Sequence, residues 1–169
     1  MALSMYQASV PVFRQLLGAL SANLAKAEAH AAERKIDTGV LLAYRLAPDM
    51  FTLKQQVQIA TDHAKGAAAR LSGEQPPKYD DNETSFAELR QRIDRTLAFL
   101  DGKRPEDIDG SEARDIELTI GGSAMRFDGQ TYLMHFAIPN FFFHVTTAYA
   151  IMRHCGVPLG KRDFMRKPE

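Results

Sequence analysis

Three polar residues in two separate segments have the types and spacing of a partial metal site. Asn140 and His144 lie four residues apart in the segment PNFFFHVTTAYAIMRHCGVPLGK. Because positions four apart share one face of a helix, their side chains would project in the same direction. His63 lies at the border of the apolar face of another helical segment, where it would face a neighbouring helix. Metal sites in helix bundles are built from such inward side chains, so these three residues are candidate ligands.

The same three residues can also have a structural role. A histidine that borders an apolar helix face is often hydrogen-bonded inside the core or at a helix interface. Zinc takes imidazole, thiolate or carboxylate ligands, and an amide oxygen is a weaker substitute. The segment around His144 has no HExxH motif, no CxxC motif and no acidic cluster that would complete the ligand set. The residues alone therefore leave a metal site and an internal hydrogen-bonded contact open.

The remaining histidines and the single cysteine have other expected roles. His30 lies in a charged, alanine-rich helix end, and we expect it to be exposed to solvent. His135 precedes Pro139, which leaves its direction relative to the fourth helix undetermined. Cys155 lies at a helix C-terminus, where the helix dipole disfavours a thiolate, so we expect a packing role. The chain has no glycine-rich phosphate loop and no GxSxG nucleophile motif.

Four amphipathic segments must position the candidate site. Apolar residues recur at helical spacing in the segments 13–24, 53–71, 86–100 and 141–152. Thr52 with Gln55, and Ser85 with Glu88, have the spacing of capping boxes at the starts of the second and third helices. The fourth helix begins either at Pro139, or earlier with a kink at the proline. Its three phenylalanines at 141–143 cover most of the helix circumference, which places this helix centrally or against a second subunit.

Between the third and fourth helices the apolar pattern changes its period from about 3.6 to 2. Apolar residues alternate with polar ones up to Gly121-Gly122, and the alternation resumes after these glycines. This pattern predicts a β-hairpin with a two-residue turn. We therefore expect an all-α four-helix bundle, with a short hairpin between helices three and four, as a single domain over residues 1–169.

The composition is that of a globular protein. The 169 residues are 45% hydrophobic and 25% charged, and the formal net charge is zero. A balanced charge gives no reason to expect nucleic acid or an anionic membrane as a partner. The single cysteine, Cys155, rules out an intrachain disulfide and favours a reducing, cytoplasmic location. We expect neither a signal peptide nor a membrane-spanning helix.

Over essentially its whole length the chain resembles the DinB/YfiT-like four-helix-bundle superfamily, in a branch of unknown function. The shared features are a long first helix, a histidine in the middle of the second, a hairpin before the fourth, and the ending of the fourth. In the DinB-like pattern a histidine precedes an LR pair that closes the helix, and GVP follows. Here His144 precedes Met-Arg at 152–153 and Gly-Val-Pro at 156–158, in the same order and spacing.

This resemblance implies a divalent-metal site, typically of nickel or zinc, made by three histidines. One comes from the second helix and two come from an HxxxH motif on the fourth. His63 matches the first position and His144 the last, whereas the middle position is Asn140. An asparagine oxygen can coordinate a metal or orient a water, with lower affinity expected. The wider superfamily includes thiol-dependent transferases and hydrolase-like enzymes, many of them homodimers, so we expect a homodimer here.

Two functions follow from these observations. The first is a non-catalytic bundle that binds a small ligand or a partner and carries a degenerate metal site. The second is a divalent-metal-dependent enzyme, of hydrolase or thiol-dependent transferase type, that uses His63, Asn140 and His144. Asparagine at the middle position favours the first function. Neither the substrate nor the metal ion follows from the sequence.

Overall fold

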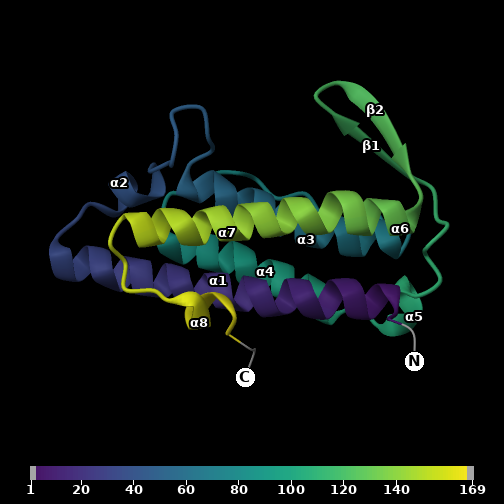
Figure 1. Ribbon diagram of the computed structural model, residues 1–169, viewed down its shortest axis with the longest axis horizontal. Helices are drawn as coiled ribbons and strands as arrows, with labels where there is room; N and C mark the ends of the chain where they lie inside the picture. Colours follow the sequence, from purple (N-terminus) through teal and green to yellow (C-terminus); the bar gives the residue numbers. More distant parts are fainter. Residues whose placement is uncertain (1–2, 167–169) are drawn as a thin grey trace.

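Four long helices lie lengthwise in a bundle in the computed structural model, which describes residues 3–166 (Figure 1). The two ends of the predicted 1–169 domain lie outside the described residues. The long helices are α1 (Met5–Arg34), α3 (Leu53–Leu71), α4 (Phe86–Asp101) and α7 (Ile138–His154). Short helices join or follow them: α2 (Thr38–Leu42), α5 (Pro105–Ile108), α6 (Gly129–Thr131) and α8 (Lys161–Phe164). The predicted four-helix bundle is confirmed.

Side-chain caps fix where the long helices begin. The Thr52 hydroxyl accepts from the Gln55 N–H at the start of α3, and the Ser85 hydroxyl accepts from the Glu88 N–H at the start of α4. Both predicted capping boxes are therefore present. A third box caps α1 at Ser4. Each box satisfies N–H groups that a helix start would otherwise leave without partners.

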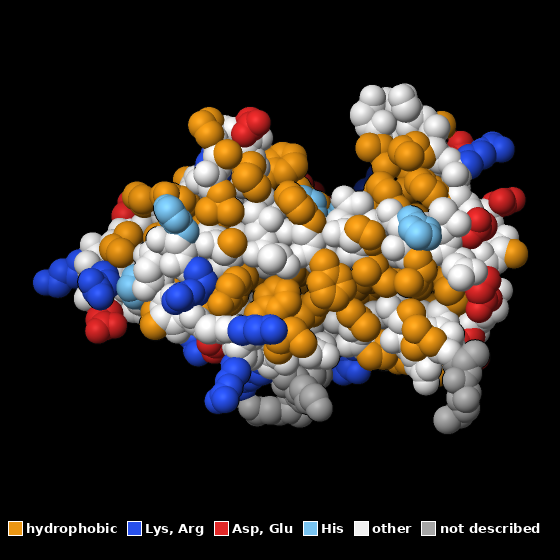
Figure 2. Space-filling model, in the orientation of Figure 1, with side chains coloured by type: hydrophobic (Ala, Val, Ile, Leu, Met, Phe, Trp, Pro, Cys, Tyr) orange, Lys and Arg blue, Asp and Glu red, His pale blue; other side chains and the backbone are white. Residues whose placement is uncertain are grey.

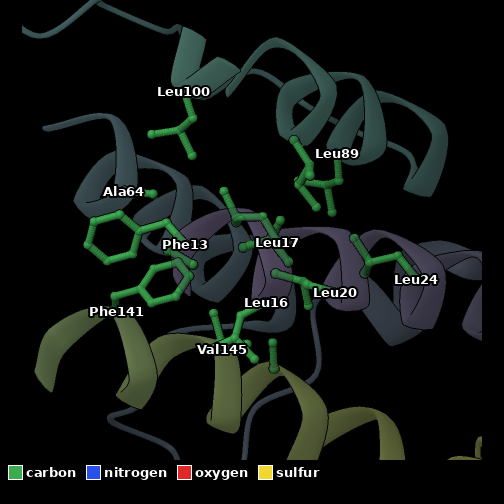
Figure 3. Packing of buried hydrophobic residues seen from close by; sticks show 14 of the residues in the cluster. Phe13, Leu16, Leu17, Leu20, Leu24, Ala64, Leu89, Leu100, Phe141 and Val145 are labelled. Atoms are coloured by element: carbon green, nitrogen blue, oxygen red, sulfur yellow. The ribbon is translucent and has the colours of Figure 1, made fainter. Parts of the chain in front are cut away.

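The core lies between the apolar faces of the four helices (Figure 3). Phe13 of α1 and Phe141 of α7 meet edge to face at its centre, with ring centroids 4.8 Å apart. The face of α3 carries Ala60, Ala64 and Ala67, all fully buried. Because alanine side chains are small, α7 can run close beside α3, and these two helices form the most extensive helix pair of the bundle. This close pair holds the candidate site.

The prediction that His30 is exposed to solvent is wrong. Its side chain is buried at the end of α1. The turn after α7 covers it, because a Cβ placed on Gly156 would lie 3.8 Å from His30 Nε2. A tertiary contact from the far end of the chain thus buries a residue whose local sequence is charged.

The hairpin projects from one end of the bundle (Figure 1). Strand β1 (Ile116–Ile120) pairs antiparallel with β2 (Ser123–Phe127), and Ile120 faces Ser123 across the turn. Gly121 and Gly122 both have positive φ, 57° and 84°, as a two-residue type I′ turn requires. The predicted hairpin is confirmed.

The fourth helical run begins well before Pro139. Helix α6 continues into a π-helix, η1 (Tyr132–Ala137), and α7 follows directly. Pro139 lies in the first turn of α7, where it provides no N–H to the preceding helical turn. The earlier of the two predicted starts is therefore the observed one, and a π-helix, not a simple kink, accommodates the proline.

Candidate functional site

The structure brings the two predicted histidines together. His63 on α3 and His144 on α7 have ring centroids 5.7 Å apart, with ring planes tilted by 14°. His144 is buried, and His63 is half-buried. The predicted contact between α3 and α7 thus places both imidazoles in one polar site at the interface of these helices.

A hydrogen-bond chain fixes the orientation of His144. Nδ1 of His144 lies 2.7 Å from the side-chain oxygen of Gln56, and the amide nitrogen of Gln56 donates to the Phe51 carbonyl at 3.1 Å. Since a carbonyl only accepts, the Gln56 nitrogen must face Phe51 and its oxygen must face His144. His144 therefore carries its proton on Nδ1, and Nε2 presents a free lone pair. Such a partner behind a histidine holds its ring and its tautomer.

Burial and neighbouring charges keep His63 neutral. Desolvation is the largest effect and the nearby His144 the second, and together with other charges they lower the pKa of His63 to about 4. Asp62 acts in the opposite direction, and Arg70 acts in the same direction as His144. Burial also lowers the pKa of His144. Both rings are therefore neutral at pH 7, the form in which imidazole binds metals or accepts hydrogen bonds.

Asn140 has a structural partner. Its side-chain nitrogen donates to the Phe136 carbonyl at 2.7 Å, one turn earlier, where the π-helix gives way to α7. This is a side-chain bond from Asn140 to the carbonyl four residues earlier in the chain. The Phe136 ring lies against His63, with centroids 5.7 Å apart. Asn140 thus holds the backbone of a residue that forms one wall of the site.

The donor set is incomplete for a zinc or nickel centre. Nitrogens bonded to one ion at about 2.0–2.1 Å lie at most about 4.2 Å apart, which rings with centroids 5.7 Å apart allow if their nitrogens face one another. Structural zinc sites have four protein ligands, and catalytic sites commonly have three. Within residues 3–166, no group of three or more histidine, cysteine, aspartate or glutamate side chains has the arrangement of a metal site. His63 and His144 therefore supply two good donors, and Asn140 is engaged through its nitrogen.

A pocket of about 270 Å³ opens beside His63. Helix α3 forms one wall, η1 the second, and strand β1 of the hairpin the third. The lining residues are Asp62, His63, Arg70, Glu117, Leu118, Thr119, Ile120, Tyr132 and Phe136. Figure 2 shows the hairpin rising from the surface at this end of the bundle. The pocket is therefore large enough for a small organic molecule and has both polar and apolar walls.

A buried arginine supports α3 next to His63, and the sequence analysis did not identify it. Arg92 of α4 is fully buried. Its guanidinium binds Glu83, the Thr61 hydroxyl and Asp62, at 3.0, 2.7 and 2.8 Å. A buried cation is stable only when its donors are satisfied in this way. The signal in the sequence was a charged residue on the apolar stripe of a helix, shortly after the acidic run at 80–83.

The same network holds the polar loop that precedes α4. Arg92 reaches the Asp80 carbonyl and the Asp81 carboxylate in this loop, at 3.2 and 2.9 Å. Glu83 is itself buried and accepts from the Gln58 amide at 2.8 Å. The loop is therefore tied to both α3 and α4, although its composition is that of a solvated surface segment.

The other candidates lie apart from the histidine pair. His135 is exposed on η1. Cys155 is half-buried after the last turn of α7, and burial raises the pKa of its thiol. A raised pKa leaves the thiol protonated and unreactive at pH 7, which agrees with the predicted packing role.

No helix within residues 3–166 is both long enough and apolar enough to cross a membrane.

Comparison with known proteins identifies the family. The sequence pattern of DUF1993, a domain of unknown function, matches residues 5–165. The crystal structure of a DinB family member protein from Shewanella denitrificans superimposes with a TM-score of 0.86 at 43% identity. The match covers 96% of this chain and 92% of the other. No curated protein matches the sequence. The chain therefore belongs to the DUF1993 family, a group of DinB-like helical bundles whose function is unknown.

Proposed function

We propose that this protein binds a small organic molecule in the pocket beside His63 and His144, without catalysing a reaction. The proposal rests on two neutral imidazoles next to a pocket of about 270 Å³. Their ring centroids lie 5.7 Å apart. Ligand sites combine apolar walls with a few fixed polar groups, and this pocket has both. His63 lines the pocket, and the neighbouring His144 is held in place because Gln56 is bonded behind it.

The histidines would contact the ligand by hydrogen bonding. A neutral imidazole accepts at one nitrogen and donates at the other. His144 donates from Nδ1 to Gln56, so only its Nε2 can accept from a ligand N–H or O–H group. The Phe136 ring, already against His63, would cover an apolar part of the ligand. The site would therefore select molecules with a hydrogen-bonding polar group next to an apolar group.

Imidazole NMR signals test this proposal directly. The protein is labelled at histidine and screened against a library of small neutral and charged molecules. A ligand of the pocket should shift the signals of His63 and His144 and leave that of His30 unchanged, since His30 is buried against the turn at Gly156, beyond the other end of α7. Saturable shifts confined to the pair would support the proposal. A screen in which no molecule shifts either signal would overturn it.

A divalent-metal-dependent enzyme, of hydrolase or thiol-dependent transferase type, is the second candidate. One observation favours it: Gln56 holds His144 with the Nε2 lone pair free, as the outer partners of metal-bound histidines do. Elemental analysis of native protein, followed by calorimetric titration with Ni²⁺ and Zn²⁺, tests this candidate. Stoichiometric metal lost in a His144→Ala variant would support it. A folded wild type that binds neither ion would contradict it.

We also propose that the protein forms a homodimer in the cytoplasm. Hydrophobic side chains gather on the face formed by α1 and α7 (Figure 2), and Phe143 is 55% exposed on α7. Zero net charge offers little repulsion between copies. Light scattering after size-exclusion chromatography measures the mass. A monomer at micromolar concentration would refute the dimer.

A further inference from the structure

The pocket beside the histidine pair contains an arginine without a carboxylate partner. Arg70 lines the pocket from α3, and its guanidinium donates to the Tyr132 hydroxyl at 3.1 Å. Tyr132 is buried, and burial raises its pKa, so the hydroxyl stays neutral and does not compensate the charge. None of the ion pairs within the described part of the chain involves Arg70.

The two acidic residues that line this pocket are already paired. Asp62 lies 2.8 Å from Arg92 and 2.7 Å from Lys65. Glu117 lies 3.3 Å from Arg126, its cross-strand neighbour in the hairpin. Each of the two carboxylates therefore has a cationic partner. Among the described residues, the guanidinium of Arg70 lacks such a partner, so it is the charged group with which a ligand of opposite charge could pair.

A glycine makes room for this guanidinium. Gly66 is buried in the middle of α3, where glycine costs about 1 kcal/mol relative to alanine. A Cβ at this position would lie only 2.5 Å from Nη1 of Arg70. The glycine thus lets the arginine side chain fold back along its own helix. It reaches Tyr132 and the pocket from there.

We infer that the pocket takes a small organic monocarboxylate, with the carboxylate on Arg70 and the apolar body between the hairpin and Phe136. Arginine binds carboxylates through paired N–H donors. Leu118 and Ile120 of β1 supply an apolar wall, and His63 lies two turns from Arg70 along α3. This inference rests on the proposed ligand-binding function and names the ligand class of the same site.

The charges of the pocket favour a singly charged ligand over phosphate. One guanidinium matches one negative charge. A phosphate dianion would bring a second charge close to Asp62 and Glu117, which have cationic partners but still line the pocket. Sites for phosphate commonly add further cations or a row of backbone N–H groups. The pocket walls supply Arg70 as their single cationic side chain.

Binding of three matched probes tests the inference on the full chain. Benzoate is the monocarboxylate, benzamide is its neutral counterpart of equal shape, and inorganic phosphate is the dianion. Calorimetry measures affinity, and histidine NMR locates the site. We expect saturable benzoate binding that shifts the His63 signal, with benzamide and phosphate binding roughly tenfold more weakly or not at all, given the strength of charged hydrogen bonds.

Two variants and a control separate the role of Arg70 from folding. Arg70→Gln removes the charge and should weaken benzoate binding roughly tenfold or more. Gly66→Ala displaces the guanidinium and breaks its bond to Tyr132, while alanine favours the helix by a similar amount, so it should weaken binding with little net change in stability. Arg45→Gln, on the exposed 43–52 connection, removes an equal charge far from the pocket and should bind benzoate as the wild type does.

The outcomes distinguish this inference from the proposed function. Unchanged benzoate affinity in both Arg70→Gln and Gly66→Ala would overturn the inference, as would tighter binding of phosphate than of benzoate. A folded wild type that binds none of acetate, butyrate and benzoate would also overturn it. Benzamide or another neutral molecule could shift the His63 and His144 signals while carboxylates do not. In that case the inference that the ligand is a carboxylate is wrong, and the proposed ligand-binding function still holds. If no molecule shifts these signals, both fail.

Discussion

The guanidinium of Arg92 lies 2.8 Å from the carboxylate of Asp62, the residue that directly precedes His63 on α3. A fully buried cation on one helix is thus bonded to the neighbour of a candidate site residue on the next helix. Because Arg92 also binds the Thr61 hydroxyl at 2.7 Å, two consecutive residues of α3 are held in place. The position of His63 along the bundle is therefore fixed by a polar network as well as by apolar packing.

Replacing Arg92 by methionine should destabilise the fold by about 3–5 kcal/mol, since it leaves the buried carboxylate of Glu83 without its cation. Urea unfolding monitored by circular dichroism measures the change. Arg95→Met is the matched control, because Arg95 also lies on α4 and over the Tyr79 ring but is exposed. It should cost less than about 1 kcal/mol. Equal losses in the two variants would show that the buried network adds no stability.

Replacing Gln56 by glutamate should raise the pKa of His144. A carboxylate next to Nδ1 favours the protonated ring, whereas in the native protein burial lowers this pKa. NMR titration of the His144 ring measures the shift. Gln55→Glu is the control, since Gln55 lies one residue away and contacts Thr52 instead. A His144 pKa that is the same in the Gln56→Glu variant and in the wild type would mean that the two side chains do not interact in solution.

The folded protein should lose stability at acidic pH because folding keeps His63 neutral. The pKa of His63 is about 4 in the folded chain, below the ordinary value of 6.5. Between pH 6.5 and pH 4 the unfolded chain binds a proton at His63 that the folded chain does not. The free energy of unfolding is therefore largest above pH 6.5 and falls as the pH drops toward 4. The expected loss is about 3 kcal/mol. Urea unfolding from pH 7.5 to 4 measures it, and His63→Phe should lose correspondingly less than the wild type over this range.

Replacing Asn140 by histidine should create or strengthen a metal site. Asn140 lies one turn before His144 on α7, and an imidazole there would add a third donor to those of His63 and His144. Calorimetry with Zn²⁺ and Ni²⁺ should show at least roughly tenfold tighter binding than in the wild type. Phe143→His, which adds an exposed imidazole on the same helix, is the control and should leave affinity unchanged. No gain in Asn140→His would count against a shared site at these positions.

Sequence reasoning recovered what depends on local pattern. The capping boxes at Thr52 and Ser85 and the hairpin turn at Gly121-Gly122 follow from periodicity and turn chemistry. The proximity of His63 and His144 was a hypothesis from the faces of two amphipathic helices and from the DinB-like resemblance. Each of these features is set by residues close together in the chain, or by the inward faces of two amphipathic helices. They could therefore be predicted without knowing how the helices are connected.

Features that depend on long-range polar contacts were not predicted. Arg92 is charged, and no periodicity rule places a charged residue in the core unless its partners are known. Those partners come from α3 and from a loop that reads as solvated. His30 was assigned to solvent because its neighbours are polar, yet the turn at Gly156 covers it. Arg70 went unnoticed because its significance comes from the pocket, which the hairpin and η1 complete.

The π-helical stretch Tyr132–Ala137 aligns the two halves of the pocket. Its i→i+5 hydrogen bonding makes a wider turn than that of an α-helix, so this stretch determines how α6 and the hairpin before it are rotated about the helix axis relative to α7. If all six residues wound as ordinary α-helix, each step would turn the chain further, and Tyr132 with the attached hairpin would rotate about the helix axis while His144 stayed where it is. The alignment of the two halves of the pocket thus depends on the π-helical winding, which accommodates one residue more than an α-helix of the same rotation would.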